Sequence, residues 1–339
     1  MMINSQNSYA NTVHGDRVKA TVDFRSLFLP KKLTPVEDSE YSDVEIEDDI
    51  NENLSPDQPE MQDADISNST KPLSVARYAE RIFVTDQKEE SQFIIPEGRF
   101  EEVQTEITPK MREILVKWLI NVHHEFNFAS DTLFNTIAYL DQVLSKKNIH
   151  KNRLQLVGAV CLWMAAKVEE IRIPPVNELI ELCNEPYTQA QFCRYEAKIL
   201  QLLNFRLQYP TTKSFLRRYL VAVSADNSLI EVAGFMCEAS LLDHRILQYR
   251  PSVVAFGIIV CSMTSLGRPC PVNLLKKYAH FEKLAEVNST INIILESTNK
   301  VLLKKIGASY LRYTDAGSSG AVISLNIDDA TIKKIYDCL

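Results

Sequence analysis

The segment "LQLVGAVCLWMAAKVEEIRIPP", residues 154–175, carries the clearest structural signal in this sequence. From Leu156 to Ala166 it holds no charged side chain, which predicts a helix buried on all sides. Lys167 and two glutamates follow at once, and a pair of prolines then ends the helix. Burial within a domain does not require these charges, so we interpret them as candidates for a contact with another molecule.

The composition favours an all-α body. The chain has 339 residues, enough for two domains of ordinary size, and 45% of them are hydrophobic. Only 9 are glycine, and runs of β-branched residues are few. The longest apolar runs, "LVGAVCLWMAA" and "VVAFGIIVC", are shorter than the roughly 20 residues of a membrane span. Since no signal-peptide pattern opens the sequence, we expect a soluble intracellular protein without a membrane partner.

Negative charge is concentrated near the N-terminus. Residues 33–70 hold thirteen acids and no Lys or Arg, so a net charge of −7 for the chain leaves +6 for the remainder. Residues 1–74 have few apolar side chains and no sustained period, and we therefore predict a disordered acidic arm. Thr34 and Ser55, each followed by proline, are candidate phosphorylation sites in this arm.

No residue pattern indicates catalysis or a cofactor. The seven cysteines form no CxxC pair, and the adjacent His123 and His124 do not form HExxH, so neither a metal nor a cofactor is expected. A glycine-rich phosphate loop and the HRD and DFG motifs of kinases are also missing. We expect a protein that is not an enzyme.

Helical patterns fill the remainder of the chain. A first helix is predicted over 72–90, with Tyr78, Ile82 and Phe83 on one face, and a linker of about twenty residues follows it. Five helices are then expected, with Ser130 as N-cap of the second and a capping box from Thr188 to Gln191 opening the fifth. Residues 304–339 show one further candidate helix, capped by Asp328.

The five-helix pattern occurs twice. Residues 153–184 and 250–280 share an arginine, an apolar helix, a proline-containing loop and a Pro-Val-Asn helix start, at a spacing of 96 to 97 residues. Lys167 aligns near Thr264 and Glu196 near Asn292, so the charges of the first copy are absent from the second. Glu170 likewise aligns near a glycine.

Several motifs resemble those of A- and B-type cyclins. "MREILVKWL" resembles their MRAILVDWL signature, "LQLVG...AAKVEEI" their LQLVG...ASKFEEI segment, and "YEAKILQLLNFRLQYPT" the end of their first cyclin box. "YRPSVVA" resembles the third helix of their second box. The resemblance implies two tandem five-helix cyclin boxes after an N-terminal helix. The expected divisions are an arm (1–74), the N-terminal helix (75–92), two boxes (108–208 and 209–303) and a C-terminal tail (304–339).

The resemblance implies a regulatory subunit of a cyclin-dependent Ser/Thr kinase, present in the nucleus and cytoplasm. Such a subunit holds the regulatory helix of the kinase in its active position. The positions that match the kinase-contacting residues of the family are Lys167, Glu196, Val168, Glu170, Leu200, Phe205, Leu207, Tyr78 and Ile82. Packing of the two N-terminal positions onto the chain's own box is the structural alternative. The sequence does not identify the kinase.

The resemblance also implies a surface that docks RxL-type motifs of substrates or inhibitors. Its matching positions are Met111, Ile114, Leu115, Trp118, Asn121, Leu154 and Gln155. Where the family pattern has acids that hold the arginine of the motif, this chain has Asn121 and Asn184, so the resemblance favours a more apolar motif. Arg112 and Asp141 match a buried structural ion pair. "RSLF", residues 25–28, itself resembles a docking motif.

Two other classes of protein fit parts of this pattern. A cyclin-fold transcription factor resembling general factor B would bind nucleic acid, but no zinc ribbon precedes the helices and no dense Lys/Arg patch appears. A transcriptional cyclin is disfavoured by the A- and B-type motifs and by the helix around Tyr78.

Overall fold

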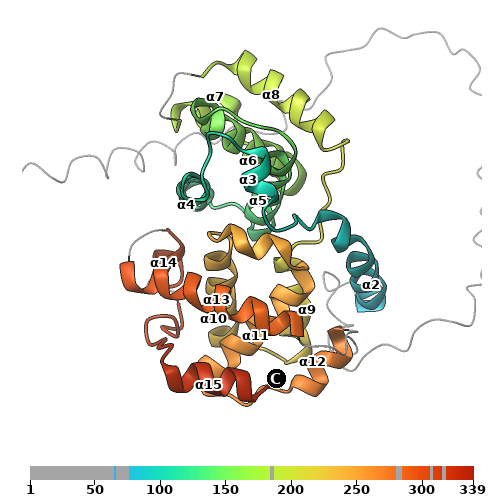
Figure 1. Cartoon of the computed structure of the whole chain (residues 1–339), viewed down its shortest axis with the longest axis vertical. Coiled ribbons are helices and arrows are strands. Elements are labelled where there is room, and N and C mark those ends of the chain that lie inside the picture. Colours follow the sequence, from blue (N-terminus) through green and yellow to red (C-terminus); the bar gives the residue numbers. More distant parts are fainter. Residues whose placement is uncertain (1–64, 66–75, 184–186, 280–284, 306–307, 315–317) are drawn as a thin grey trace, which may run out of the picture. The chain divides into compact units, whose positions relative to one another are not determined.

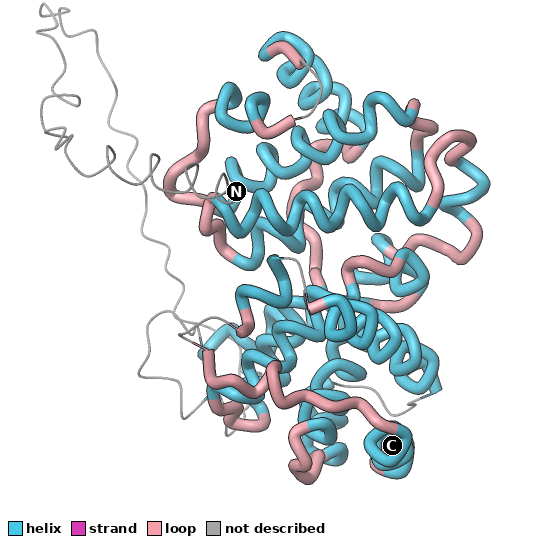
Figure 2. The backbone as a smooth tube through the Cα atoms, turned by 90° about the vertical axis from the view of Figure 1, so that its left-hand side faces the viewer, coloured by secondary structure: helices cyan, strands magenta, loops and turns pink. Residues whose placement is uncertain are grey.

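The computed structural model describes residue 65 and residues 76–183, 187–279, 285–305, 308–314 and 318–339. These residues all belong to one compact unit, Pro59–Leu339, and they contain helices and loops but no β-strand (Figure 2). The all-α prediction is therefore confirmed. The predicted arm, with Thr34, Ser55 and residues 25–28, lies outside the described residues, apart from Asp65.

The first bundle consists of five helices (Figure 1). They are α4 (Pro109–Glu125), α5 (Ser130–Lys146), α6 (Leu154–Glu169), α7 (Val176–Glu181) and α8 (Gln189–Leu202), with the 3-10 turn η4 (Lys151–Arg153) before α6. Helix α6 is buried along most of its length and packs against α4, α5 and α8. The apolar segment that opens the sequence analysis is thus the centre of this bundle.

The second bundle repeats this order with α9 (Thr212–Ala222), α10 (Asn227–Ser240), α11 (Pro251–Ser265), α12 (Val272–Ala279) and α13 (Ala285–Lys304). The 3-10 turn η5 (His244–Gln248) precedes its central helix α11, which packs against α9, α10 and α13. Gly257 is required where α11 meets α13, because a Cβ atom there would lie 2.7 Å from the Thr290 hydroxyl oxygen.

Local sequence signals explain most helix starts. Thr108 accepts a hydrogen bond from the Met111 amide, and Pro109 occupies the first position of α4. The Thr188–Gln191 capping box is present at α8, and Asp328 caps α15 (Asp329–Asp337). The prediction that Ser130 caps α5 is wrong, because α5 begins at Ser130 and its N-cap is Ala129.

The N-terminal segment is shorter and less regular than predicted. It consists of η2 (Ala76–Tyr78), α2 (Ala79–Glu90) and η3 (Ser91–Phe93), and the expected linker contains a further helix, α3 (Arg99–Val103). Phe83 is buried against Phe215 and Tyr219, with ring centroids 5.4 and 6.0 Å apart. Tyr78 and Ile82 are exposed, so the prediction that all three share one face is wrong.

Polar contacts fix α2 to the second bundle. The Glu90 carboxylate accepts hydrogen bonds from the backbone amide (2.8 Å) and the hydroxyl (2.6 Å) of Ser252, at the start of α11. The guanidinium of Arg218 on α9 binds both Asp65 and Glu80, the latter at 3.0 Å. Helix α2 is therefore held at both ends.

The C-terminal residues form part of the packed structure. Helix α14 (Ala308–Arg312) contacts α4 and α10, and α15 contacts α11. The Tyr313 hydroxyl donates to the buried Glu238 carboxylate (2.8 Å), and it lies where a Cβ atom on residue 234 would stand, which explains the glycine there. Tyr336 on α15 donates to Asn292 on α13 (2.8 Å).

Candidate protein-binding site

Lys167 and Glu196 form an ion pair on the surface of the first bundle. Lys167 lies in the last turn of α6 and Glu196 in the middle of α8, and their Nζ and Oε1 atoms are 2.5 Å apart. The two side chains are 33% and 19% exposed, so the pair is neither buried nor fully solvated. Water screens such a pair, which limits its contribution to stability.

A tryptophan fixes the position of the lysine. The Lys167 ammonium lies 3.3 Å from the centroid of the Trp163 ring, one turn earlier on α6, in a cation–π contact. Trp163 packs edge-on against Phe192 of α8, with ring centroids 6.4 Å apart. Sequence reasoning missed Trp163, although an aromatic residue four positions before a lysine on a helix was a usable signal.

The other positions predicted for kinase contact include exposed apolar side chains. Phe205 is 70% exposed, and both it and Asn204 have positive φ angles of 55° and 53°. Asparagine adopts this left-handed backbone conformation readily, whereas it costs a phenylalanine about 1–2 kcal/mol. Val168 is also exposed, whereas Leu200 and Leu207 are partly buried. Strained backbone that presents a large apolar side chain to solvent is typical of a binding surface.

Two further apolar residues were not predicted. Ile171 is fully exposed and Ile173 is half-exposed, both in the loop that follows α6. Compared with the cyclin pattern, this loop has one extra residue before the prolines, and that insertion was the available signal. Cys193 on α8 is also exposed and lies three residues before Glu196.

Glu170 points into its own bundle. Its Oε1 atom accepts hydrogen bonds from the Ala129 amide (2.8 Å) and from the Thr132 hydroxyl at the start of α5. The neighbouring Glu169 accepts from the Asn135 side chain (2.7 Å). Burial, with the nearby Asp131, raises the pKa of Glu169 above its usual range. Glu170 thus links the end of α6 to the start of α5, and these contacts favour a structural role.

The residues predicted for motif docking divide into two groups. Ile114 is 57% exposed, and Met111, Trp118 and Gln155 are partly exposed, while Asn121 lies on the exposed surface of α4. Leu115 and Leu154 are buried in the core, where the side chain of Leu115 packs against Gly158 of α6. The accessible part of this surface is therefore Met111, Ile114, Trp118, Asn121 and Gln155.

Arg112 and Asp141 form a buried ion pair between α4 and α5. Both N–H···O distances are 2.6 Å, and the two side chains are 0% and 2% exposed. Arg112 also donates to the Leu241 carbonyl (3.0 Å) at the end of α10, a contact with the second bundle that the sequence did not reveal. The pair lies inside the protein and has a structural role.

The described part of the chain contains no group of residues that could hold a metal ion. Within the same residues, no helix is both long and apolar enough to span a membrane. The described residues thus form two similar helical bundles, the first of which carries a partly exposed charged pair held by a tryptophan.

Comparisons with known proteins identify the family. The model of the cyclin N-terminal domain matches residues 81–208, and that of the cyclin C-terminal domain matches residues 210–319. The chain therefore belongs to the cyclin family. The family consists of non-catalytic regulatory proteins, in agreement with the expectation that this chain is not an enzyme.

Several curated relatives are B-type cyclins. Cyclin-B2-1 of Oryza sativa subsp. japonica is 34% identical over 234 residues, which cover 69% of this chain and 55% of the relative. G2/mitotic-specific cyclin-B of Arbacia punctulata is 30% identical over 250 residues, which cover 74% and 61%. The chain thus spans somewhat more than half the length of these relatives.

Solved structures share the fold. A viral cyclin from herpesvirus saimiri has a TM-score of 0.57 and 20% identity, covering 65% of this chain and 97% of its own. A chain of the yeast RNA Pol II CTD kinase CTDK-1 complex has a TM-score of 0.55 and 16% identity, covering 74% and 81%. These likenesses establish the arrangement of helices.

Proposed function

We propose that this chain is the regulatory subunit of a cyclin-dependent Ser/Thr protein kinase. In this role it binds the regulatory helix of the kinase and holds it in the active position. Membership of the cyclin family and the similarity to B-type cyclins support the proposal. One of the solved structures that share this fold belongs to the yeast RNA Pol II CTD kinase complex CTDK-1. The relatives do not support the alternative of a general transcription factor.

One observation carries the proposal. The Lys167–Glu196 pair is held in a partly exposed position by Trp163, and the neighbouring residue in the chain, Val168, exposes an apolar side chain. A charge pair at an apolar interface is tolerated when its remaining donors and acceptors find partners. The ammonium and the carboxylate together offer both to the main chain of a bound helix.

The second bundle supports this interpretation by contrast. Thr264, which aligns near Lys167, is buried, and Asn292, which aligns near Glu196, is bonded by Tyr336 of α15. Helix α15 packs on α11 there. Among the described residues, no helix of this chain occupies the corresponding position on the first bundle. The first bundle thus leaves open a face that the second covers.

Activation follows from selective binding. A kinase is active when the Glu of its regulatory helix pairs with its catalytic-domain Lys. A subunit that binds this arrangement alone shifts the population towards it. A shift from 1:99 to 99:1 requires about 5.5 kcal/mol of differential binding free energy. The proposed contact residues comprise the exposed Val168, Ile171 and Phe205, the partly buried Leu200 and Leu207, and the exposed Tyr78 and Ile82 of the N-terminal segment.

We also propose that Met111, Ile114, Trp118, Asn121 and Gln155, named here the docking surface, bind short motifs of substrates or inhibitors. Its support is the exposure of these side chains on α4 and α6 together with the family resemblance.

The experiment compares kinase activity recovered with tagged full-length chain and with the variants Lys167→Ala and Glu196→Ala. Each removes one partner of a charge-assisted contact, so we expect a loss of roughly tenfold or more in activity towards a short Ser/Thr peptide. Arg268→Ala is the matched control, because Arg268 follows the equivalent end of α11 and forms a surface ion pair with Asp226. Full stimulation by folded Lys167 and Glu196 variants would refute the proposal.

A further inference from the structure

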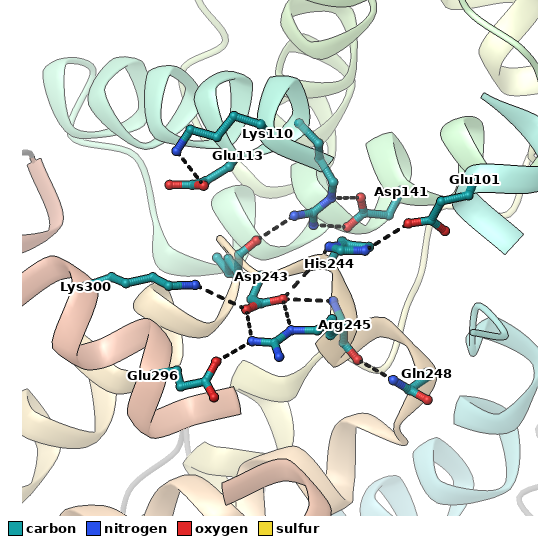
Figure 3. A network of polar contacts seen from close by, with 12 residues as sticks. Glu101, Lys110, Glu113, Asp141, Asp243, His244, Arg245, Gln248, Glu296 and Lys300 are labelled. Carbon is teal, nitrogen blue, oxygen red and sulfur yellow. Dashed lines mark hydrogen bonds and ion pairs between the residues drawn. The ribbon is translucent and has the colours of Figure 1, made fainter. Parts of the chain in front are cut away.

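A basic cleft lies beside the docking surface. It has a volume of about 270 Å³ and is bounded by α4, the η5 turn and α13 (Figure 3). Its cations are Lys110 and Lys117 of α4, Arg245 of η5, and Lys300 and Lys304 of α13. Its carboxylates are Glu113 and Asp243. Five cations face these two carboxylates and Glu296, which binds Arg245 from α13, so the net charge is +2 with His244 counted as neutral.

The carboxylates form ion pairs with several of these cations but do not balance their total charge. Glu113 binds both Lys110, at 3.0 Å, and Lys117. Asp243 is nearly buried at the base of the cleft, where it binds Arg245 at 2.7 Å and lies 3.8 Å from the Lys300 ammonium. Lys110 and Lys300 are each more than 60% exposed. Lys304 has no ion-pair partner among the described residues, so the excess positive charge faces solvent.

The cleft and the docking surface are continuous on α4. Residues three and four positions apart on a helix are neighbours, so Ile114 lies between Lys110 and Lys117. Trp118 adjoins Ile114 from the following turn. A peptide bound through apolar side chains at Ile114 and Trp118 would therefore continue directly into a row of lysines.

We propose that this cleft binds an acidic segment of the docked peptide, a run of Asp or Glu next to its apolar residues. The proposal rests on the docking function proposed above and specifies its ligand class. Charge complementarity selects such a segment and disfavours an Arg- or Lys-bearing motif. This agrees with the expectation from the cyclin resemblance that Asn121 replaces an acid that would hold the arginine of the motif.

The geometry favours carboxylates over a phosphate group. Arg245 is the guanidinium of the cleft, and it is already bound by Asp243 and by Glu296 at 2.6 Å. No free guanidinium fork among the lining residues is thus left for the bidentate contact that phosphate prefers. The lysines instead offer separate point charges along α4 and α13, a pattern that suits several carboxylates in sequence.

The test measures binding of a fluorescein-labelled peptide, Leu-Phe followed by six Glu, to full-length chain by anisotropy. Lys300→Glu/Lys304→Glu reverses two exposed charges in the cleft, and Lys333→Glu/Lys334→Glu on α15 is the control with the same change in net charge. We expect the cleft variant to bind roughly tenfold or more weakly and the control within roughly twofold of wild type. A peptide in which six Gln replace the six Glu should bind wild type as weakly as the Glu peptide binds the cleft variant. The affinity of the Glu peptide for wild type should fall with added salt.

Several results would overturn the proposal. Equal binding to both double variants would exclude the cleft, and equal binding of the Gln peptide would exclude charge recognition. A phosphoserine peptide that binds far more tightly than the Glu peptide would indicate a phosphate site. Binding that appears only after the acids of residues 33–70 are neutralised would identify that segment as the occupant.

The kinase proposal is tested separately. The Lys300→Glu/Lys304→Glu variant should stimulate a kinase normally towards a short peptide that lacks a docking segment. A wild-type chain that stimulates no kinase would refute the proposed function, whereas the anisotropy results, which involve no kinase, would still stand.

Discussion

The buried guanidinium of Arg112 makes three hydrogen bonds. Its guanidinium binds both oxygens of Asp141 and the Leu241 carbonyl, and it is fully buried. A buried charge that loses its partner destabilises the fold strongly, whereas replacing both partners by apolar residues of similar size is often tolerated.

We therefore expect Arg112→Met to lower the free energy of unfolding by about 3–5 kcal/mol. The double variant Arg112→Met/Asp141→Leu should recover a large part of that loss, because no carboxylate remains buried without a partner. Urea-induced unfolding measures both. A double variant less stable than the single variant would show that the charges themselves stabilise the fold.

His123 predicts a specific dependence of stability on pH. It is buried, and burial lowers the pKa of its imidazole from 6.5 to about 4, while its Nε2 atom lies 2.8 Å from the Ala129 carbonyl oxygen. Between pH 6.5 and 4 the His123 imidazole is therefore protonated in the unfolded chain and neutral in the folded chain. Stability from this group is present above pH 6.5 and is lost as the pH falls towards 4.

We expect His123→Gln, which keeps a donor for Ala129, to reduce this dependence. The difference between wild type and variant in the free energy of unfolding should change by up to about 3 kcal/mol across the window. Thermal or urea unfolding at a series of pH values measures it. Parallel pH profiles for the two proteins would contradict the assignment.

Among the helices, α5 shows how a tertiary contact replaces a local signal. Ser130 has the residue type of an N-cap, but α5 begins at Ser130, and the Glu170 carboxylate at the end of α6 binds the Ala129 amide and the Thr132 hydroxyl. We expect Glu170→Ala to lower the free energy of unfolding by about 1 kcal/mol, a typical net contribution of a hydrogen bond.

The Glu170→Ala variant also distinguishes a structural role of this residue from a role in kinase binding. Stimulation of the kinase should stay within roughly twofold of wild type under conditions where the protein is folded, since the Glu170 side chain is engaged inside the bundle. Circular dichroism and the kinase assay supply the two measurements. A loss of stimulation without a loss of stability would restore Glu170 to the kinase-binding set.

The helices were predictable because their signals are local. Apolar runs around Val160 and Ile259, and caps such as Thr188 and Asp328, are written within a few residues of each helix. The short α3 and the inward position of Phe83 depend on packing against distant helices, so periodicity alone did not find them.

The site was predictable in part. The Lys167–Glu196 pair followed from the comparison of the two repeats and the family resemblance. Trp163 beneath the lysine, the role of Glu170 and the cations from α13 beside α4 depend on residues brought together only by the fold.

For the chain as a whole, the C-terminal residues contribute to stability. Val322 and Ile335 are fully buried, and Tyr313 and Arg312 bind Glu238, whose pKa is raised by burial. Deletion of residues 308–339 would expose the apolar surface of α11 and leave a buried carboxylate without partners.

We expect this deletion to lower the Tm by at least about 5 °C, as a loss of a few kcal/mol would in a protein of this size. Differential scanning calorimetry measures the change. Tyr336→Phe, which removes only the hydrogen bond to Asn292, is the matched control and should shift the Tm by roughly 2 °C or less. An unchanged Tm after deletion would show that the tail is dispensable.

Cys193 gives this molecule a natural labelling position. Of the seven cysteines, Cys193 is exposed, three are partly exposed and three are buried, and Cys193 shares one stripe of α8 with Glu196 and Leu200. A maleimide dye should thus react fastest with Cys193 in the wild-type protein, without engineering. Slower labelling when a partner is bound would then map the footprint of that partner and report the rate at which it dissociates.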